Sequence, residues 1–320
     1  MKDIDSHYTS TKAMLFMIIA AAMMNLSQVF TRIFHRDNLA ETHACFSRPT
    51  DPLSVVVTLS FYKYLIIFLI CVLTFLIKKK TILDQTIKIK SLAGWLTAFG
   101  IGDALASMML FLGSLSVPLA FNSLLGDLHI LVAPLLIYFL NPNRVIRQKI
   151  FISIVGFSGT ILFAYGQYDQ NLGSNWSILL PLSASGLWCM VALASQKVSL
   201  ISHNFSQIAV AVSGLILTFS YSTLFKLPLL TYNFVSGTLS AAIGLSIVAQ
   251  LFFVKSMTSG DVIASLIAAP AYACFGAIFG WLFFGETLSL LEGIAAVLVL
   301  TAIIASGLVD RFQPNSKPPS

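Results

Sequence analysis

The composition of this 320-residue chain is typical of a protein embedded in lipid. Hydrophobic residues make up 57% of it and charged residues only 10%, whereas soluble domains carry about 25% charged residues. So few charges cannot solvate a surface of this size, which excludes an ordinary soluble enzyme or binding module. The net charge of +6 does not indicate nucleic-acid binding, because Lys and Arg lie in short loops between apolar runs.

Apolar runs long enough to cross a bilayer, about 20 residues each, recur along the whole chain. They predict an all-α membrane protein with ten transmembrane helices, approximately Ala13–Phe30, Leu53–Ile77, Ser91–Leu112, Val117–Leu140, Ile150–Tyr165, Trp176–Ala194, Ile208–Phe225, Phe234–Phe253, Val262–Phe284 and Leu291–Val309. The predicted break between the third and fourth helices lies at Ser114, Ser116 and Pro118. A long outer loop, residues 31–51, is predicted to follow the first helix.

The distribution of positive charge predicts the orientation. With both termini in the cytoplasm, the inner segments hold 14 Lys and Arg residues, the outer segments hold 4, and Lys63 lies within a span. Cytoplasmic loops of membrane proteins are enriched in Lys and Arg. We therefore expect a multi-pass protein of the plasma membrane, the inner membrane of a bacterium, with cytoplasmic tails at residues 1–12 and 310–320.

Ten helices divide into two sets of five, residues 13–166 and 176–309. Because five crossings are an odd number, the second set must run inverted relative to the first, an arrangement that recurs in secondary transporters. An offset of 142 residues aligns Ser123-Leu124 with Ser265-Leu266 and Leu140 with Leu282. We therefore predict two inverted five-helix repeats, the first more divergent than the second.

One local motif resembles a known family. The segment from Trp281 to Gly293 contains a Gly-Glu pair, Gly285-Glu286, followed by a glycine within the next helix. In this and in its helix count the chain resembles ten-helix, EamA-type members of the drug/metabolite transporter superfamily, in which Lys63 matches a basic residue often found in the second helix. The resemblance implies substrate transport through a central cavity with no bound cofactor, and it leaves the substrate open.

Two carboxylates lie within predicted spans, where ionisable groups are costly and usually functional. Asp103 and Asp127 each lie 12 residues from Leu115 at the predicted hairpin turn, so they would share one depth in the membrane. They are candidates for a substrate or coupling site that binds a proton or a cation. The alternative is a structural polar contact, for example with Lys63.

The fourth helix carries further polar residues on one side. Asn122, Gly126 and His129 recur at helical spacing, and Ser123 and Asp127 lie on the neighbouring stripe. This polar arc must avoid lipid. His129 can titrate near neutral pH, or it can simply form a hydrogen bond between helices.

Polar residues of three other helices complete the candidate site. Asn25 and Gln28 in the first helix share a face with Arg32 and are expected to line the cavity and its mouth, although Arg32 fits a lipid-interface residue better. Gln250 is the deepest polar residue of the eighth helix. Tyr272 in the ninth helix either contacts the substrate or serves only in packing.

Two groups of acidic and metal-capable residues have structural explanations that we prefer. Glu286 and Glu292 precede the last helix, where carboxylates cap a helix or complement its dipole, so Gly285, Glu286 and Gly293 are expected to be structural. The outer loop holds several potential metal ligands, but their spacing fits no zinc motif, and a solvated loop is expected: His35, Asp37, Glu41, His43 and Cys45.

The predicted function is secondary transport of a small polar metabolite by alternating access. Buried acids favour a cationic or zwitterionic solute, such as an amino acid or a nucleoside-linked compound like S-adenosylmethionine, with proton or exchange coupling. The alternatives are a drug or amino-acid exporter of the same family and a polytopic membrane enzyme, which the acid-poor inner loops disfavour. No cofactor, metal or nucleic acid is expected, and the protein would be a monomer or a homodimer.

Overall fold

The computed structural model describes residues 2–41, 52–77, 86–129, 131–132, 147–168, 175–198, 203–226, 237–258, 268–269 and 271–312. Every regular element in these ranges is a helix, so the predicted all-α class is confirmed for the described part of the chain. The elements are α1 (Lys2–Glu41), α2 (Pro52–Ile77), α4 (Thr86–Ser116), α5 (Leu119–Gly126), α7 (Arg147–Tyr168), η3 (Asn175–Ile178), α8 (Leu179–Val198), α9 (His203–Phe225), α10 (Gly237–Met257), α12 (Ala271–Phe284) and α13 (Leu290–Phe312).

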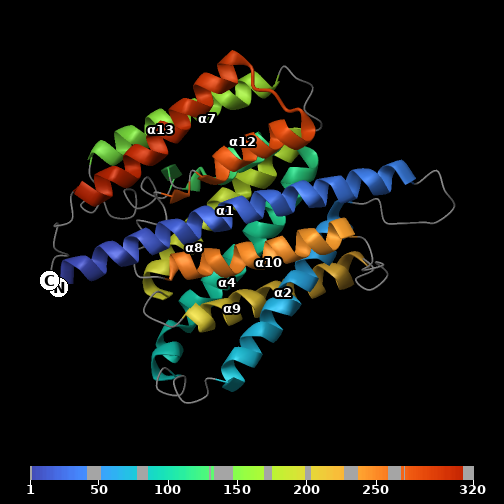
Figure 1. The fold of residues 1–320 in the computed structure, drawn as a ribbon, viewed down its shortest axis with the longest axis vertical. Coiled ribbons are helices and arrows are strands. Elements are labelled where there is room, and N and C mark those ends of the chain that lie inside the picture. Colours follow the sequence, from blue (N-terminus) through green and yellow to red (C-terminus); the bar gives the residue numbers. More distant parts are fainter. Residues whose placement is uncertain are drawn as a thin grey trace.

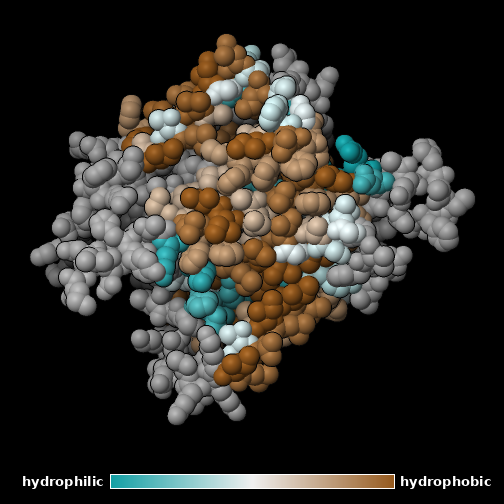
Figure 2. Space-filling model, viewed as in Figure 1, coloured by the Kyte–Doolittle hydropathy of each residue, from teal (hydrophilic) through white to brown (hydrophobic). Residues whose placement is uncertain are grey.

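Five of the described helices are long and apolar enough to span a membrane. They are Lys12–Asp37, Pro52–Ile77, Leu92–Ser116, His203–Phe225 and Gly237–Met257. Large apolar side chains are exposed on the outer faces of these and other helices, including Leu76, Ile77, Ile216 and Leu224, and apolar residues cover most of the described surface in Figure 2. Soluble proteins rarely expose so much apolar surface to water, so this is a membrane protein whose outer face contacts lipid.

The helices pack in a pattern that links the two halves of the chain. α1 lies along α10, and α4 lies along α8 and α9. The pairs α2–α9, α5–α12 and α7–α13 also pack together, and Figure 1 shows α7 and α13 side by side at one edge. In the same view, α1 begins and α13 ends on the same side of the molecule (Figure 1).

Small side chains allow these helices to approach closely. A side chain at Gly214 of α9 would collide with the Tyr64 ring of α2, and one at Gly276 of α12 would collide with Ser123 of α5. Between α1 and α10, the Ser27 hydroxyl donates to the carbonyl oxygen of Ala242 at 2.6 Å. Small residues and serine hydroxyls are the usual contacts between helices in lipid, where no hydrophobic effect drives association.

The structure corrects the predicted end of the first helix. The sequence predicted a loop from Thr31, but α1 continues to Glu41 without a break. No glycine or proline occurs before Pro49, so nothing interrupts the helical backbone there. The rest of the predicted outer loop, with His43 and Cys45, lies outside the described residues.

The predicted fourth span is also interrupted. The hairpin break is where it was expected, since α4 ends at Ser116 and α5 begins at Leu119, but α5 ends after eight residues at Gly126. Asp127 and Leu128 form a turn. A second turn occurs at Ala269, just before α12, within the span predicted from Val262. The beginning of that span, and Pro270, lie outside the described residues.

Candidate functional site

A cavity of about 50 Å³ lies among α1, α4, α5, α8, α10 and α12. This space is large enough for a few water molecules. Its lining includes apolar side chains of α1 and α10 and a compact set of polar and aromatic residues: Asp103, Ser107, Asp127, His129, Trp188, Gln250, Phe253 and Tyr272. The cavity thus gathers Asp103, Asp127 and His129, all three of them buried.

Asp103, in the middle of α4, has a neutral hydrogen-bond donor and a cation as neighbours. Its carboxylate is 1% exposed and accepts a hydrogen bond from the side-chain amide of Gln250 at 2.7 Å. Lys63 of α2 is equally buried and near enough to attract this carboxylate, but its ammonium group forms no hydrogen bond to it. Instead, the ammonium lies 4.6 Å from the centre of the Tyr64 ring. The negative charge of Asp103 therefore has a nearby positive counterpart.

Asp127 lies where the predicted fourth span is broken. It follows α5 directly, is 1% exposed, and accepts a hydrogen bond from the backbone N–H of Ala273 at 3.2 Å. Ala273 belongs to the first turn of α12, whose free N–H groups and helix dipole favour an anion. Unlike Asp103, Asp127 has no cationic partner among the described residues. A buried carboxylate without a counter-charge is costly, so this position favours uptake of a proton or a cation.

Aromatic rings form one side of the cavity around Trp188. The indole stacks on Phe253 at 6.0 Å, and it meets the rings of Tyr272 at 6.1 Å and His129 at 5.3 Å edge to face. The faces of such rings attract cations, Trp most strongly. Together with the two carboxylates, these rings form a site whose chemistry matches a positively charged solute with an apolar part.

A layer of neutral hydrogen bonds closes one end of the cavity. We call it the polar layer, and its members are Asn25, Gln28, Asn122, Ser123 and Tyr272. The Gln28 amide donates to the Tyr272 hydroxyl at 2.6 Å, and the Ser123 hydroxyl donates to the Asn25 side-chain oxygen at 2.8 Å. The Asn25 amide donates to the carbonyl oxygen of Tyr272 at 2.8 Å. The layer thus joins α1, α5 and α12.

The structure brings together most, but not all, of the predicted site. Both carboxylates face the interior as predicted, and His129, Gln250 and Tyr272 line the same cavity. Asn25, Gln28 and Asn122 were expected to line it but lie in the polar layer instead. Lys63 lies behind Asp103 and outside the cavity lining. No hydrogen bond joins Asp103 to Asp127; Asp103 accepts one from Gln250 and Asp127 one from Ala273.

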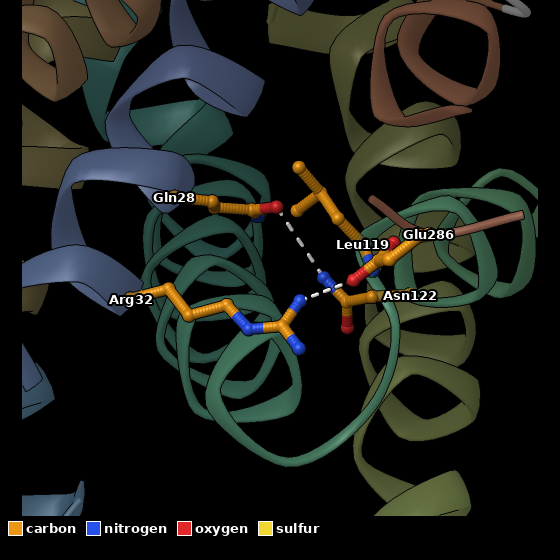
Figure 3. A network of polar contacts seen from close by, with 5 residues as sticks. All are labelled: Gln28, Arg32, Leu119, Asn122 and Glu286. Carbon is orange, nitrogen blue, oxygen red and sulfur yellow. Dashed lines mark hydrogen bonds and ion pairs between the residues drawn. The ribbon is translucent and has the colours of Figure 1, made fainter. Parts of the chain in front are cut away.

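The structure corrects the interpretation of Arg32 and of the acidic pair near α13. Arg32 is more than a lipid-interface residue: it forms an ion pair with Glu286, which also accepts a hydrogen bond from the backbone N–H of Leu119 at 2.8 Å (Figure 3). Glu292 behaves as expected for a cap, since it accepts the Ser289 backbone N–H at 2.6 Å. Of the two acids, only Glu292 caps the helix that follows it.

Apart from Tyr272, sequence reasoning missed the aromatic part of the site. Trp188 lies in the interior of a predicted span, whereas membrane tryptophans usually gather at the two interfaces. That position was an available signal. Phe253 and the cavity-lining methionines Met17, Met24 and Met257 had no such signal, because apolar residues fill every span. Among the described residues no group of His, Cys, Asp and Glu is arranged to hold a metal ion.

The fold and the site together define an all-α membrane protein with a polar and aromatic cavity between its helices. No protein-family model matches the chain, and a comparison with curated proteins finds no significant match. A solved structure titled "Crystal structure of protein" is similar, with a TM-score of 0.61 and 15% identity, over 96% of this chain and 99% of its own. At this identity the likeness shows a shared fold over nearly the whole chain and nothing beyond the fold.

Proposed function

We propose that this protein is a secondary transporter of the drug/metabolite transporter type, which carries a small cationic or zwitterionic solute across the plasma membrane. The observation that carries the proposal is Asp127. It is buried at a helix break, it lines a cavity, and it has no cationic partner among the described residues. Broken helices whose ends face a central site are typical of secondary transporters.

The proposed architecture is ten transmembrane helices in two inverted repeats of five. In chain order the spans are α1, α2, α4, the span begun by α5, α7, α8, α9, α10, the span ended by α12, and α13. Moving each helix five places along this order converts the α1–α10 contact into α8–α4, α2–α10 into α9–α4, and α1–α12 into α8–α5. The pairs α2–α9, α5–α12 and α7–α13 convert into themselves, as a two-fold axis requires.

The positions of the two helix breaks support the same repeat. The turn after α5 includes Asp127, and the turn before α12 includes Ala269. These residues are separated by the 142-residue offset that aligns the two halves of the sequence. The breaks in the fourth and ninth spans therefore fall at equivalent positions.

The substrate class follows from the charges and rings of the cavity. Lys63 offsets the charge of Asp103, which leaves Asp127 as the anion to be neutralised by a proton or by the solute. The rings of Trp188, Phe253 and Tyr272 then attract the cation and contact its apolar part. An amine-bearing metabolite fits this chemistry better than an anionic one.

Uptake by protein reconstituted into liposomes tests the function. A panel of cationic, zwitterionic and anionic metabolites is supplied with and without an imposed pH gradient, and a solute-loaded lumen tests exchange and export. We expect accumulation of a cationic or zwitterionic solute, and we expect its loss in Asp127→Asn. Asp37→Asn, a carboxylate exposed near the end of α1, is the matched control. Equal uptake by wild-type protein and Asp127→Asn would overturn the assignment of Asp127.

A further inference from the structure

One carboxylate ties together three parts of the chain at the end of the cavity where the polar layer lies. Glu286 forms an ion pair with Arg32 of α1, and its second oxygen accepts the backbone N–H of Leu119 at 2.8 Å, at the start of α5 (Figure 3). The guanidinium of Arg32 also lies 4.4 Å from the centre of the Phe284 ring of α12. We call Arg32, Glu286 and the Leu119 amide the latch.

The local backbone is shaped to place Glu286 in this position. Gly285 has a φ of +65°, a left-handed conformation that glycine adopts without strain. This turn folds the chain back, so that the backbone N–H of Glu286 donates to the carbonyl oxygen of Gly280 at 3.1 Å. A side chain at Gly280 would collide with the Glu286 carboxylate. These two glycines, both of which precede Glu286, therefore keep the glutamate directed toward α1 and α5.

The latch, the polar layer and the cavity follow one another in the same order along two helices. On α1, Met24 lines the cavity, Gln28 belongs to the polar layer, and Arg32 belongs to the latch. On the span that contains α5, Asp127 lines the cavity and Leu119 lies in the latch, with members of the polar layer between them. A solute leaving the cavity at this end would therefore meet first the polar layer and then the latch.

The latch differs from the polar layer in its contact with solvent. The Arg32 and Glu286 side chains are 29% and 14% exposed, whereas members of the polar layer are almost completely buried. A partly exposed pair regains hydration when it separates, so it breaks at much lower cost than a buried pair. Its partners belong to α1 and to the connection between α12 and α13, which lie in opposite halves of the chain.

We propose that the Arg32–Glu286 pair is a reversible gate latch, which holds this end of the cavity closed and must separate before a solute passes. The inference rests on the proposed transport function. Glu286 then has two structural roles: it caps α5 through Leu119, and it joins the two halves of the protein through Arg32. Loss of the pair shifts the protein toward states in which the cavity is open at this end.

The test measures access to the cavity directly. Ser107 lines the cavity, so Ser107→Cys serves as the reporter in a protein whose four native cysteines, Cys45, Cys71, Cys189 and Cys274, are replaced by alanine. A membrane-impermeant thiol reagent is added to proteoliposomes from the side of Arg32. We expect labelling about tenfold faster in Arg32→Gln and in Glu286→Gln, as the loss of a charge-assisted hydrogen bond implies.

Two matched variants make the result specific. Arg32→Lys keeps a cation beside Glu286 and should label nearly as slowly as the parent. Arg36→Gln removes an exposed arginine one turn further along α1 and should leave the rate unchanged. Monodisperse elution in size-exclusion chromatography confirms that each variant is folded. Equal labelling rates in Arg32→Gln, Glu286→Gln and the parent would overturn the latch.

The labelling needs no substrate, so it separates the two proposals. If no solute is transported but labelling responds to the latch variants, the gate stands and the transport function falls. If a solute is transported but the labelling rate does not respond to the latch variants, the transport function stands and the latch is overturned.

Discussion

Asp127 accepts a hydrogen bond from the backbone N–H of Ala273, a residue 146 positions further along the chain, at 3.2 Å. At the other end of the same helix pair, Glu286 accepts the backbone N–H of Leu119. α5 and α12 therefore cap each other: each N-terminus is met by a carboxylate that follows the other helix. One cap lies at the cavity and the other at the latch, so we expect a movement of either helix to change the contacts at both places.

The first prediction concerns the two cavity carboxylates. Asp127→Asn removes a negative charge that has no counterpart within the described ranges, so transport of a cationic solute should fall about tenfold or more, because a charge-assisted hydrogen bond is worth about 1.5–3 kcal/mol. Asp103→Asn should also impair transport, since it leaves Lys63 as a buried cation without its partner. Initial uptake rates in liposomes are the measurement, with insertion checked by immunoblotting of the membranes.

The same variant reports on proton coupling. Asparagine resembles a permanently protonated aspartate, so uptake by Asp127→Asn should no longer vary with pH if Asp127 carries the coupled proton. Wild-type uptake should still vary. A variant that keeps the wild-type pH profile would place the coupling proton elsewhere, and one that transports normally at every pH would make Asp127 structural.

The second prediction concerns orientation. From the excess of Lys and Arg in the predicted inner loops, we expect the start of α1 in the cytoplasm and its far end outside. In a cysteine-free background, Asp37→Cys should react with an impermeant thiol reagent added to intact cells, and Lys12→Cys should react only after the cells are opened. The opposite labelling pattern would invert the topology and assign the latch to the cytoplasmic end.

The third prediction tests close helix packing. Gly214→Ala places a methyl group against the ring of Tyr64, and overpacking of this kind costs about 1–3 kcal/mol. Gly244→Ala on α10 meets nothing within 4 Å and should be neutral or stabilise the helix by up to about 1 kcal/mol. Thermal unfolding of the detergent-purified protein compares the two. Equal melting temperatures for the two variants would mean that α2 and α9 pack less closely at Gly214 than the structure indicates.

The fourth prediction concerns the start of α13. Ser289 and Glu292 form a capping box, in which each side chain accepts the other's backbone N–H, at 2.6 and 3.3 Å. Ser289→Ala should therefore destabilise the protein by about 1 kcal/mol. Thr74→Ala is the control, because its exposed hydroxyl bonds only to its own helix at Ile70 and its loss should be nearly silent. Similar melting shifts for both would remove the cap as a source of stability.

The sequence predicted those features of the site that depend on the chemistry of a single residue. A buried carboxylate such as Asp103 is costly in lipid, so its place inside the protein followed from the sequence alone. The break after Gly126 did not, because no proline marks it and the half-helix is stabilised by contacts with α12. The Arg32–Glu286 pair joins residues 254 positions apart. Residue spacing along the sequence cannot predict a pair of this kind, and considered alone Arg32 was interpreted as a lipid-interface residue.

The volume of the cavity has a consequence for the resting protein. A space of about 50 Å³ holds only a few waters, too few for a continuous file of water across a hydrocarbon core about 30 Å thick. Ions crossing through such a dry region face a large dehydration penalty. For the proposed transporter we therefore expect little leakage of ions or protons through this cavity while no solute is bound.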